Sequence, residues 1–195
     1  MAVHRLESSG LSKEKGPVVV TGATGGVGSI AIDILSQKDY EVTALTGKKD
    51  EVDYLKSIGA TKVLFRDDLD LKKIRPLGKE IWAGAVDNLG GDVLSLITTQ
   101  MKWGGVVSVI GLAASHQFNG TVMPFILRNV GVLGIDSVNA PMANRKKIWS
   151  LLGTDLKPKN LSSMVTTVRL DELPSVFEKI MQGKIKGRTV VEFNS

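Results

Sequence analysis

The feature that most constrains the fold is a glycine-rich segment directly after a continuous apolar run. The run Pro17–Thr21 (PVVVT) lacks the polar alternation of a half-exposed strand, which predicts a strand buried on both faces of a parallel sheet. It leads into Gly22–Gly28 (GATGGVG), and Gly26–Ser36 then has the apolar spacing of a helix. A strand, a tight glycine turn and a helix N-terminus can hold the diphosphate of a dinucleotide, because backbone N–H groups and the positive helix end face the anion.

The loop departs from the dinucleotide-binding pattern G-x-G-x-x-G at one position. The aligned residues are Ala23, Gly25 and Gly28, so alanine replaces the first glycine. Gly28 would let the helix pack closely on the sheet. No Gly-Lys-Ser/Thr follows, which excludes a nucleoside-triphosphate loop of the Walker A type. A glycine-rich turn in an unrelated α/β fold is the alternative interpretation.

Strand-like and helix-like segments alternate along the rest of the chain, which favours a parallel sheet with crossover helices. Asp50 is predicted to cap a helix that ends at Gly59. The fold class predicted is α/β, a doubly wound parallel (Rossmann) sheet over residues 1–156, followed by a C-terminal segment over residues 157–195. The further strands expected are Glu41–Thr46, Thr61–Phe65, Ile81–Val86, Gly105–Ile110, Val130–Ser137 and Arg188–Phe193, and the further helices Asp92–Met101, Met123–Asn129, Pro141–Leu152 and Glu172–Gln182.

Composition excludes several classes of protein. The 195 residues are 43% apolar, enough for one domain with a small appendage, and no apolar run approaches the roughly 20 residues of a membrane span. Residues 1–15 contain no apolar signal region, so we expect a cytoplasmic protein. The chain has no cysteine and two distant histidines, so we expect no metal site. The net charge of +5 favours an anionic ligand, but the basic groups are short and scattered, so nucleic acid is not the expected partner.

The end of the second predicted strand indicates which dinucleotide is bound. NAD sites place an acid there for the ribose 2′-hydroxyl, whereas NADP sites place a cation. The strand ends in Thr46-Gly47-Lys48-Lys49 without an acid, which favours NADPH, with Thr46 donating to the 2′-phosphate and Lys48 pairing with it. Two alternatives stay open: the lysines are ordinary loop charges, or Asp50 serves the ribose instead of capping a helix.

Six segments that cover nearly the whole chain carry a resemblance to a known family: VVVTGATGGVGSIA (18–31), YLKSIGATKVL (54–64), WAGAVDNLGG (82–91), VMPFILRNV (122–130), GIDSV (134–138) and GKIKGRTVVEF (183–193). Together they resemble the zinc-independent quinone oxidoreductase branch of the medium-chain dehydrogenase/reductase superfamily, and most of all its acrylyl-CoA reductase-like group. Alanine at position 23 is usual in this branch.

The resemblance implies a set of cofactor-binding residues. Thr24, Gly25, Gly26 and Val27 would hold the diphosphate, and Thr46, Gly47 and Lys48 the 2′-phosphate. Lys62 and Arg188 match further cofactor-contacting positions, and the alternative for each is a surface side chain. Leu112, Ile126 and Ser137 match positions around the nicotinamide half, and core packing is equally compatible with the first two.

The resemblance also implies an activity: an oxidoreductase that transfers a hydride from NADPH to an activated alkene or quinone, without a metal and as a homodimer. Its members begin with a GroES-like catalytic domain that this sequence lacks, as an excised domain or a truncated product would. The segment from residue 157 would pack toward that domain, so we expect exposed apolar surface that favours self-association. Tyr40, Tyr54 and His116 could donate a proton, but no motif singles one out, so no catalytic residue is assigned. The alternative function is a non-catalytic dinucleotide-sensing or nucleic-acid-binding module on the same fold.

Overall fold

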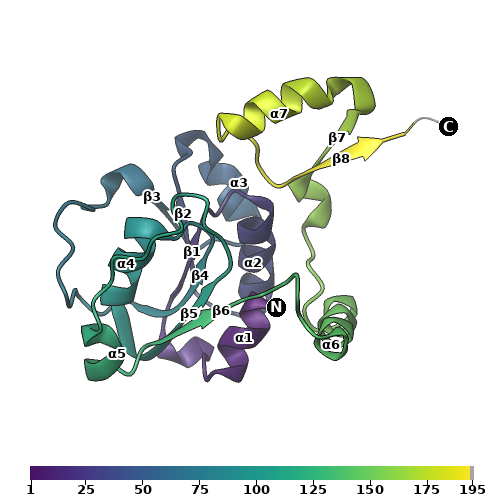
Figure 1. Cartoon of the computed structure of the whole chain (residues 1–195). Coiled ribbons are helices and arrows are strands. Elements are labelled where there is room, and N and C mark those ends of the chain that lie inside the picture. Colours follow the sequence, from purple (N-terminus) through teal and green to yellow (C-terminus); the bar gives the residue numbers. More distant parts are fainter. Residues whose placement is uncertain (194–195) are drawn as a thin grey trace.

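The computed structural model describes residues 1–193 and contains one six-stranded, fully parallel sheet (Figure 1). The strand order β3-β2-β1-β4-β5-β6 reverses between β1 and β4, as in a doubly wound fold. The predicted fold class is confirmed. The six strands are β1 (Val18–Thr21), β2 (Val42–Thr46), β3 (Lys62–Phe65), β4 (Trp82–Asp87), β5 (Met101–Val109) and β6 (Gly131–Gly134).

Two apolar clusters cover the two faces of this sheet, because successive strand residues point to opposite sides. Val18 and Val20 of β1 pack in one cluster with the helices α1 and α2, and Val19 packs in the other with α4. All three valines are fully buried, as their unbroken apolar run predicts. The helices are α1 (Ala2–Ser8), α2 (Gly26–Gln37), α3 (Val52–Ser57), α4 (Gly91–Thr99), α5 (Met123–Leu127), α6 (Met142–Gly153) and α7 (Leu173–Met181).

Residues 165–193, called the arm below, form a second sheet that is separate from the main one. Strands β7 (Val165–Arg169) and β8 (Arg188–Glu192) pair in parallel, and α7 makes the crossover between them (Figure 1). The chain that leads to the arm is fixed to α2 at Asp33, a buried carboxylate. Asp33 accepts hydrogen bonds from the backbone N–H of Asn160 at 2.9 Å and from its side-chain amide at 3.0 Å.

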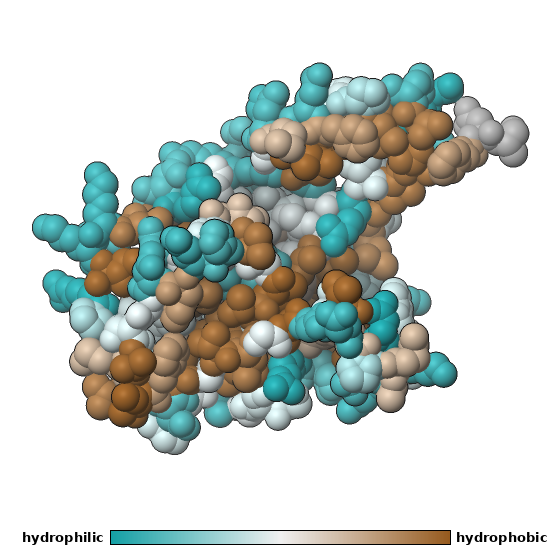
Figure 2. Space-filling view, in the orientation of Figure 1, coloured by the Kyte–Doolittle hydropathy of each residue, from teal (hydrophilic) through white to brown (hydrophobic). Residues whose placement is uncertain are grey.

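Apolar side chains lie exposed on this arm, as the sequence predicts for the C-terminal segment. Figure 2 shows apolar surface along α7 and β8 of the arm, and further apolar surface on the face of the main domain below it. On the arm they include Phe177, Ile180, Met181, Val190 and Phe193. Each helix within residues 1–193 is too short or too polar to traverse a bilayer.

Candidate functional site

A cavity of about 1040 Å³ opens at the carboxyl ends of β1, β2 and β3. Ligands of doubly wound sheets bind at this edge, next to the point where the strand order reverses. The glycine loop forms one wall, and the segment before β8 forms the opposite one. Its lining includes Thr24–Gly28, Leu45–Glu51, Arg66, Asp67, Asn88, Leu89, Ala113, Gln182–Ile185 and Arg188.

The glycine loop turns tightly into α2 and leaves hydrogen-bond donors facing the cavity. The N–H of Gly25 donates to the carbonyl of Gly22 at 2.9 Å, and the first bond within the helix runs from Ser29 to Gly25 at 2.8 Å. The amides of residues 26–28 precede that bond, so the helix itself offers them no acceptor. They lie at the positive end of the helix dipole, where an anion is stabilised.

Arg188 lies directly over this loop. A Cβ added to Gly26 would come within 1.7 Å of its guanidinium, so the glycine makes room for the arginine. The backbone holds Arg188 there, because the N–H of Gly187 donates to the carbonyl of Thr24 at 2.8 Å. A bidentate cation therefore lies beside the free amides of the helix N-terminus, which is a donor set suited to a phosphate group.

Two more cations lie where β2 and β3 end. The Lys48 ammonium donates to the carbonyl of Ile185, across the cavity, and its backbone N–H donates to the Thr46 hydroxyl at 3.0 Å. Burial lowers the pKa of Lys48, while the nearby Glu51 carboxylate acts in the opposite direction. The guanidinium of Arg66 lies close to Gly47, 3.5 Å from where a Cβ on that residue would be.

The prediction that Asp50 caps a helix is wrong. Asp50 lies within a 3₁₀ turn over Lys49–Glu51, and neither this turn nor α3 has a capping side chain. Asp50 is instead one of the residues that line the cavity, together with Glu51 and Asp67. The cause is the short turn inserted between strand and helix, which moves the start of α3 to Val52.

The inner wall is held by a buried polar network at the end of β4. Asp87 accepts hydrogen bonds from the Thr21 hydroxyl at 2.8 Å and from the Gly90 N–H at 2.8 Å. Asn88, which lines the cavity, donates its side-chain amide to the Thr21 carbonyl at 2.7 Å. Burial raises the pKa of Asp87, although these hydrogen bonds oppose the shift. The network fixes the β1–β4 junction, where the strand order reverses.

Lys62 does not reach the cavity. It begins β3, and Phe65, three residues later, pairs with Thr46 at the carboxyl end. At a rise of about 3.3 Å per residue, Lys62 lies about 10 Å from that end. Its ammonium forms an ion pair with Glu41 at 3.2 Å, and the side chain is exposed. In this structure Lys62 is therefore a surface side chain, which was the alternative to a cofactor contact.

The three residues expected around a nicotinamide also lie outside the cavity lining. Ser137 follows β6, is exposed, and accepts a hydrogen bond from Arg145 through its carbonyl at 2.7 Å. Leu112 is 66% exposed and Ile126 is 73% exposed, so the alternative of core packing is wrong for both. Leu112 is adjacent to Ala113, which does line the cavity.

The three potential proton donors lie away from the cavity. Tyr40 is buried and donates to Glu7 at 3.2 Å, and burial raises the pKa of its hydroxyl to about 12. Tyr54 donates to Ser29 at 2.9 Å, and His116 is exposed. None of the three lines the cavity.

Arg66, Asn88 and the segment 182–185 line the cavity without having been identified as site residues from the sequence. The signal for Arg66 was present, because it follows a predicted strand end and ligands bind at the carboxyl ends of parallel strands. Segment 182–185 gave no such signal, since only the return of the arm brings it to the glycine loop.

Known proteins resemble this chain in sequence and in fold. The sequence model of a family described as zinc-binding dehydrogenase matches residues 26–152, more than half of the chain. The chain belongs to the zinc-binding dehydrogenase family. Within residues 1–193, this family member has no cluster of three or more histidine, cysteine or acidic side chains that could hold a metal ion.

Three relatives of this dehydrogenase-family chain are close in sequence or structure. Acrylyl-CoA reductase AcuI of Ruegeria pomeroyi is 46% identical over all of this chain and 59% of its own length. "Putative quinone oxidoreductase YhfP" of Bacillus subtilis is 46% identical over 98% of this chain and 58% of its own; its crystal structure with NAD bound superimposes with a TM-score of 0.92. The yhdH oxidoreductase of Salmonella enterica, in complex with NADP, is 41% identical with a TM-score of 0.94, over 99% of this chain and 59% of its own.

These matches confirm the predicted resemblance to the quinone oxidoreductase and acrylyl-CoA reductase branch of the medium-chain dehydrogenase/reductase superfamily. The chain spans about three fifths of the length of these relatives.

Proposed function

We propose that this chain is the cofactor-binding part of an NADPH-dependent oxidoreductase that reduces an activated alkene, such as an acrylyl-CoA-like compound, or a quinone. The names of the two 46%-identical relatives support this substrate class, and the dinucleotides in the solved relatives support the cofactor class. We further infer that it acts as a homodimer, for which β6 provides an open sheet edge.

The observation that carries the choice of NADPH is the pair of cations at the ends of β2 and β3. Lys48 and Arg66 flank Gly47, and no acid stands at the strand end over residues 46–49. NAD-specific sites need a carboxylate there for the ribose hydroxyl. One solved relative holds NAD and another NADP, so the preference for NADPH rests on the residues of this chain.

The donor set around the cavity fits a phosphorylated dinucleotide. The free amides of residues 26–28 and the Arg188 guanidinium would hold the diphosphate, and Lys48, Arg66 and the Thr46 hydroxyl would hold the 2′-phosphate. When bound, the nicotinamide supplies a hydride to the electron-poor carbon of the substrate. This chain would contribute binding and orientation, and residues 182–185 and Arg188, which line the cavity, would shield the phosphates from water on one side.

Calorimetric titration of the unaltered chain with NADP⁺ and NAD⁺ tests this proposal. We expect NADP⁺ to bind at least about tenfold more tightly, which corresponds to about 1.4 kcal/mol from the extra charge-assisted contacts. Equal affinities would overturn the preference for the phosphate. Binding of neither dinucleotide would overturn the function itself.

A further inference from the structure

The segment Gln182–Gly187, called the strap below, crosses the cavity from the arm to the glycine loop. Residues 182–185 line the cavity, and Gly187 pairs with the loop through Thr24. Arg188 follows at once and places its guanidinium over Gly26. The position of the strap therefore determines where this cation lies.

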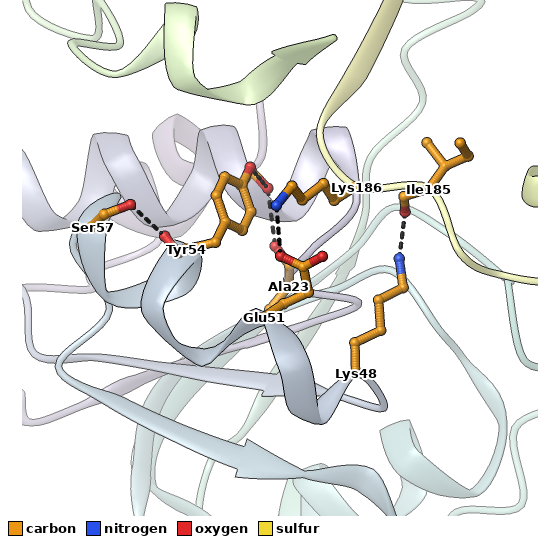
Figure 3. A network of polar contacts seen from close by, with 8 residues as sticks. Ala23, Lys48, Glu51, Tyr54, Ser57, Ile185 and Lys186 are labelled. Atoms are coloured by element: carbon orange, nitrogen blue, oxygen red, sulfur yellow. Dashed lines mark hydrogen bonds and ion pairs between the residues drawn. The ribbon is translucent and has the colours of Figure 1, made fainter. Parts of the chain in front are cut away.

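One side chain of the strap is turned away from the cavity and fixed to α3 and the turn before it. The ammonium of Lys186 forms an ion pair with the Glu51 carboxylate at 2.9 Å and lies 5.0 Å from the centre of the Tyr54 ring (Figure 3). The side chain of Glu51 is 20% exposed and that of Lys186 is 44% exposed, so solvent screens this ion pair only in part. The ring adds a cation–π attraction.

The Tyr54 ring is itself fixed to the glycine loop. Its hydroxyl donates to Ser29 at 2.9 Å, and the Ser29 hydroxyl donates to the carbonyl of Ala23 at 3.2 Å. A continuous chain of contacts thus runs from the strap through Tyr54 to the loop that carries the free amides. Lys48, at the other side of the cavity, donates to the strap carbonyl of Ile185 (Figure 3).

We propose that Glu51, Tyr54 and Lys186 form a latch that positions the strap, and with it Arg188, for the diphosphate of the cofactor. The latch is a set of positioning residues: Lys186 does not line the cavity, and the Glu51 carboxylate is engaged by Lys186. The inference rests on the proposed function, because it assigns the latch a role in dinucleotide affinity.

A Glu51→Met variant distinguishes positioning of the strap by the latch from a direct effect of the Glu51 charge on the bound anion. Removing a negative charge beside an anion site should by itself strengthen binding of NADP⁺. Opening the latch should weaken it, and we expect the affinity to fall about two- to fivefold, the range of a partly exposed ion pair. The two explanations predict opposite signs.

Asp50→Met is the matched control. It removes the same charge from the adjacent residue, which also lines the cavity but makes no hydrogen bond or ion pair with the strap in the part of the chain described. We expect about twofold tighter binding of NADP⁺ from the lost repulsion. Hydrogen exchange of the Gly187 amide, measured without a ligand, should become faster in Glu51→Met and stay unchanged in Asp50→Met.

A double-mutant cycle measures whether Glu51 and Lys186 act together, which a general loss of structure would not produce. If the latch acts as one unit, Lys186→Met weakens NADP⁺ binding and adding Glu51→Met causes little further loss. Tighter binding by Glu51→Met, unchanged exchange at Gly187, or additive losses would each overturn the latch. If the unaltered chain binds NADP⁺ and Glu51→Met binds it equally well, the latch fails and the proposed function stands. If the unaltered chain binds neither dinucleotide, both fail.

Discussion

A Lys48→Glu variant is expected to bind NADP⁺ about 10- to 100-fold more weakly than the unaltered chain, while its affinity for NAD⁺ is kept or improved. The ammonium offers charge-assisted hydrogen bonds worth about 1.5–3 kcal/mol each, and a carboxylate would repel the 2′-phosphate. The same carboxylate could accept a hydrogen bond from the ribose hydroxyl of NAD⁺. Titration with both dinucleotides measures the reversal.

Lys49→Glu controls for net charge in this experiment. Lys49 lines the same cavity one residue further on, and its ammonium lies 5.9 Å from the centre of the Phe65 ring. We expect its variant to lose less than about threefold in NADP⁺ affinity, as a general reduction of positive charge would cause. Equal losses in the two variants would mean that the lysines act only as loop charges, and would contradict the specific role of Lys48.

Gly28→Ala is expected to destabilise the fold by about 1–3 kcal/mol and to abolish dinucleotide binding. The added Cβ would lie 2.5 Å from the Gly22 carbonyl oxygen and 2.9 Å from the Ala23 Cα. Both atoms belong to the backbone of the loop, so the clash can be relieved only by moving the loop away from α2. Chemical denaturation measures the lost stability, and titration measures the lost binding.

Gly26→Ala is the matched control, two residues earlier in the same loop. Its Cβ would meet the flexible end of Arg188 and not the backbone, so the arginine can move aside. We expect a stability within about 0.5 kcal/mol of the unaltered chain, with NADP⁺ affinity about tenfold lower because Arg188 is displaced. If Gly28→Ala were as stable as Gly26→Ala, the close helix–strand approach would not matter for this loop.

The fold was predictable from local pattern because its central strands β1, β2 and β4 are buried on both faces. Val18–Val20 lie between two strands and are covered by helices, so neither face of β1 contacts water. A strand in that position carries apolar residues without alternation, and this unbroken run is what the sequence shows. The glycine loop was predictable for a similar reason: a strand, a turn and a helix start occur consecutively in the sequence. The predicted loop residues Thr24–Val27 and the strand-end residues Thr46–Lys48 all line one cavity.

Three features were harder to place from the sequence, two of them because they depend on distant segments. Lys62 was assigned by resemblance to the cofactor, but the register of β3 with β2 leaves it at the far end of its strand. Asp50 looks like a helix cap until the extra turn before α3 is known. The strap meets the glycine loop through a bond between Gly187 and Thr24, residues 163 positions apart, and no local pattern reports such a contact.

A crystal structure of the chain with NADP⁺ tests the central claim most directly. We expect the diphosphate on the amides of residues 26–28 beside Arg188, and the 2′-phosphate within hydrogen-bond distance of the Lys48 ammonium. A dinucleotide bound away from the glycine loop, or a 2′-phosphate that points to solvent with Lys48 still on the Ile185 carbonyl, would contradict it.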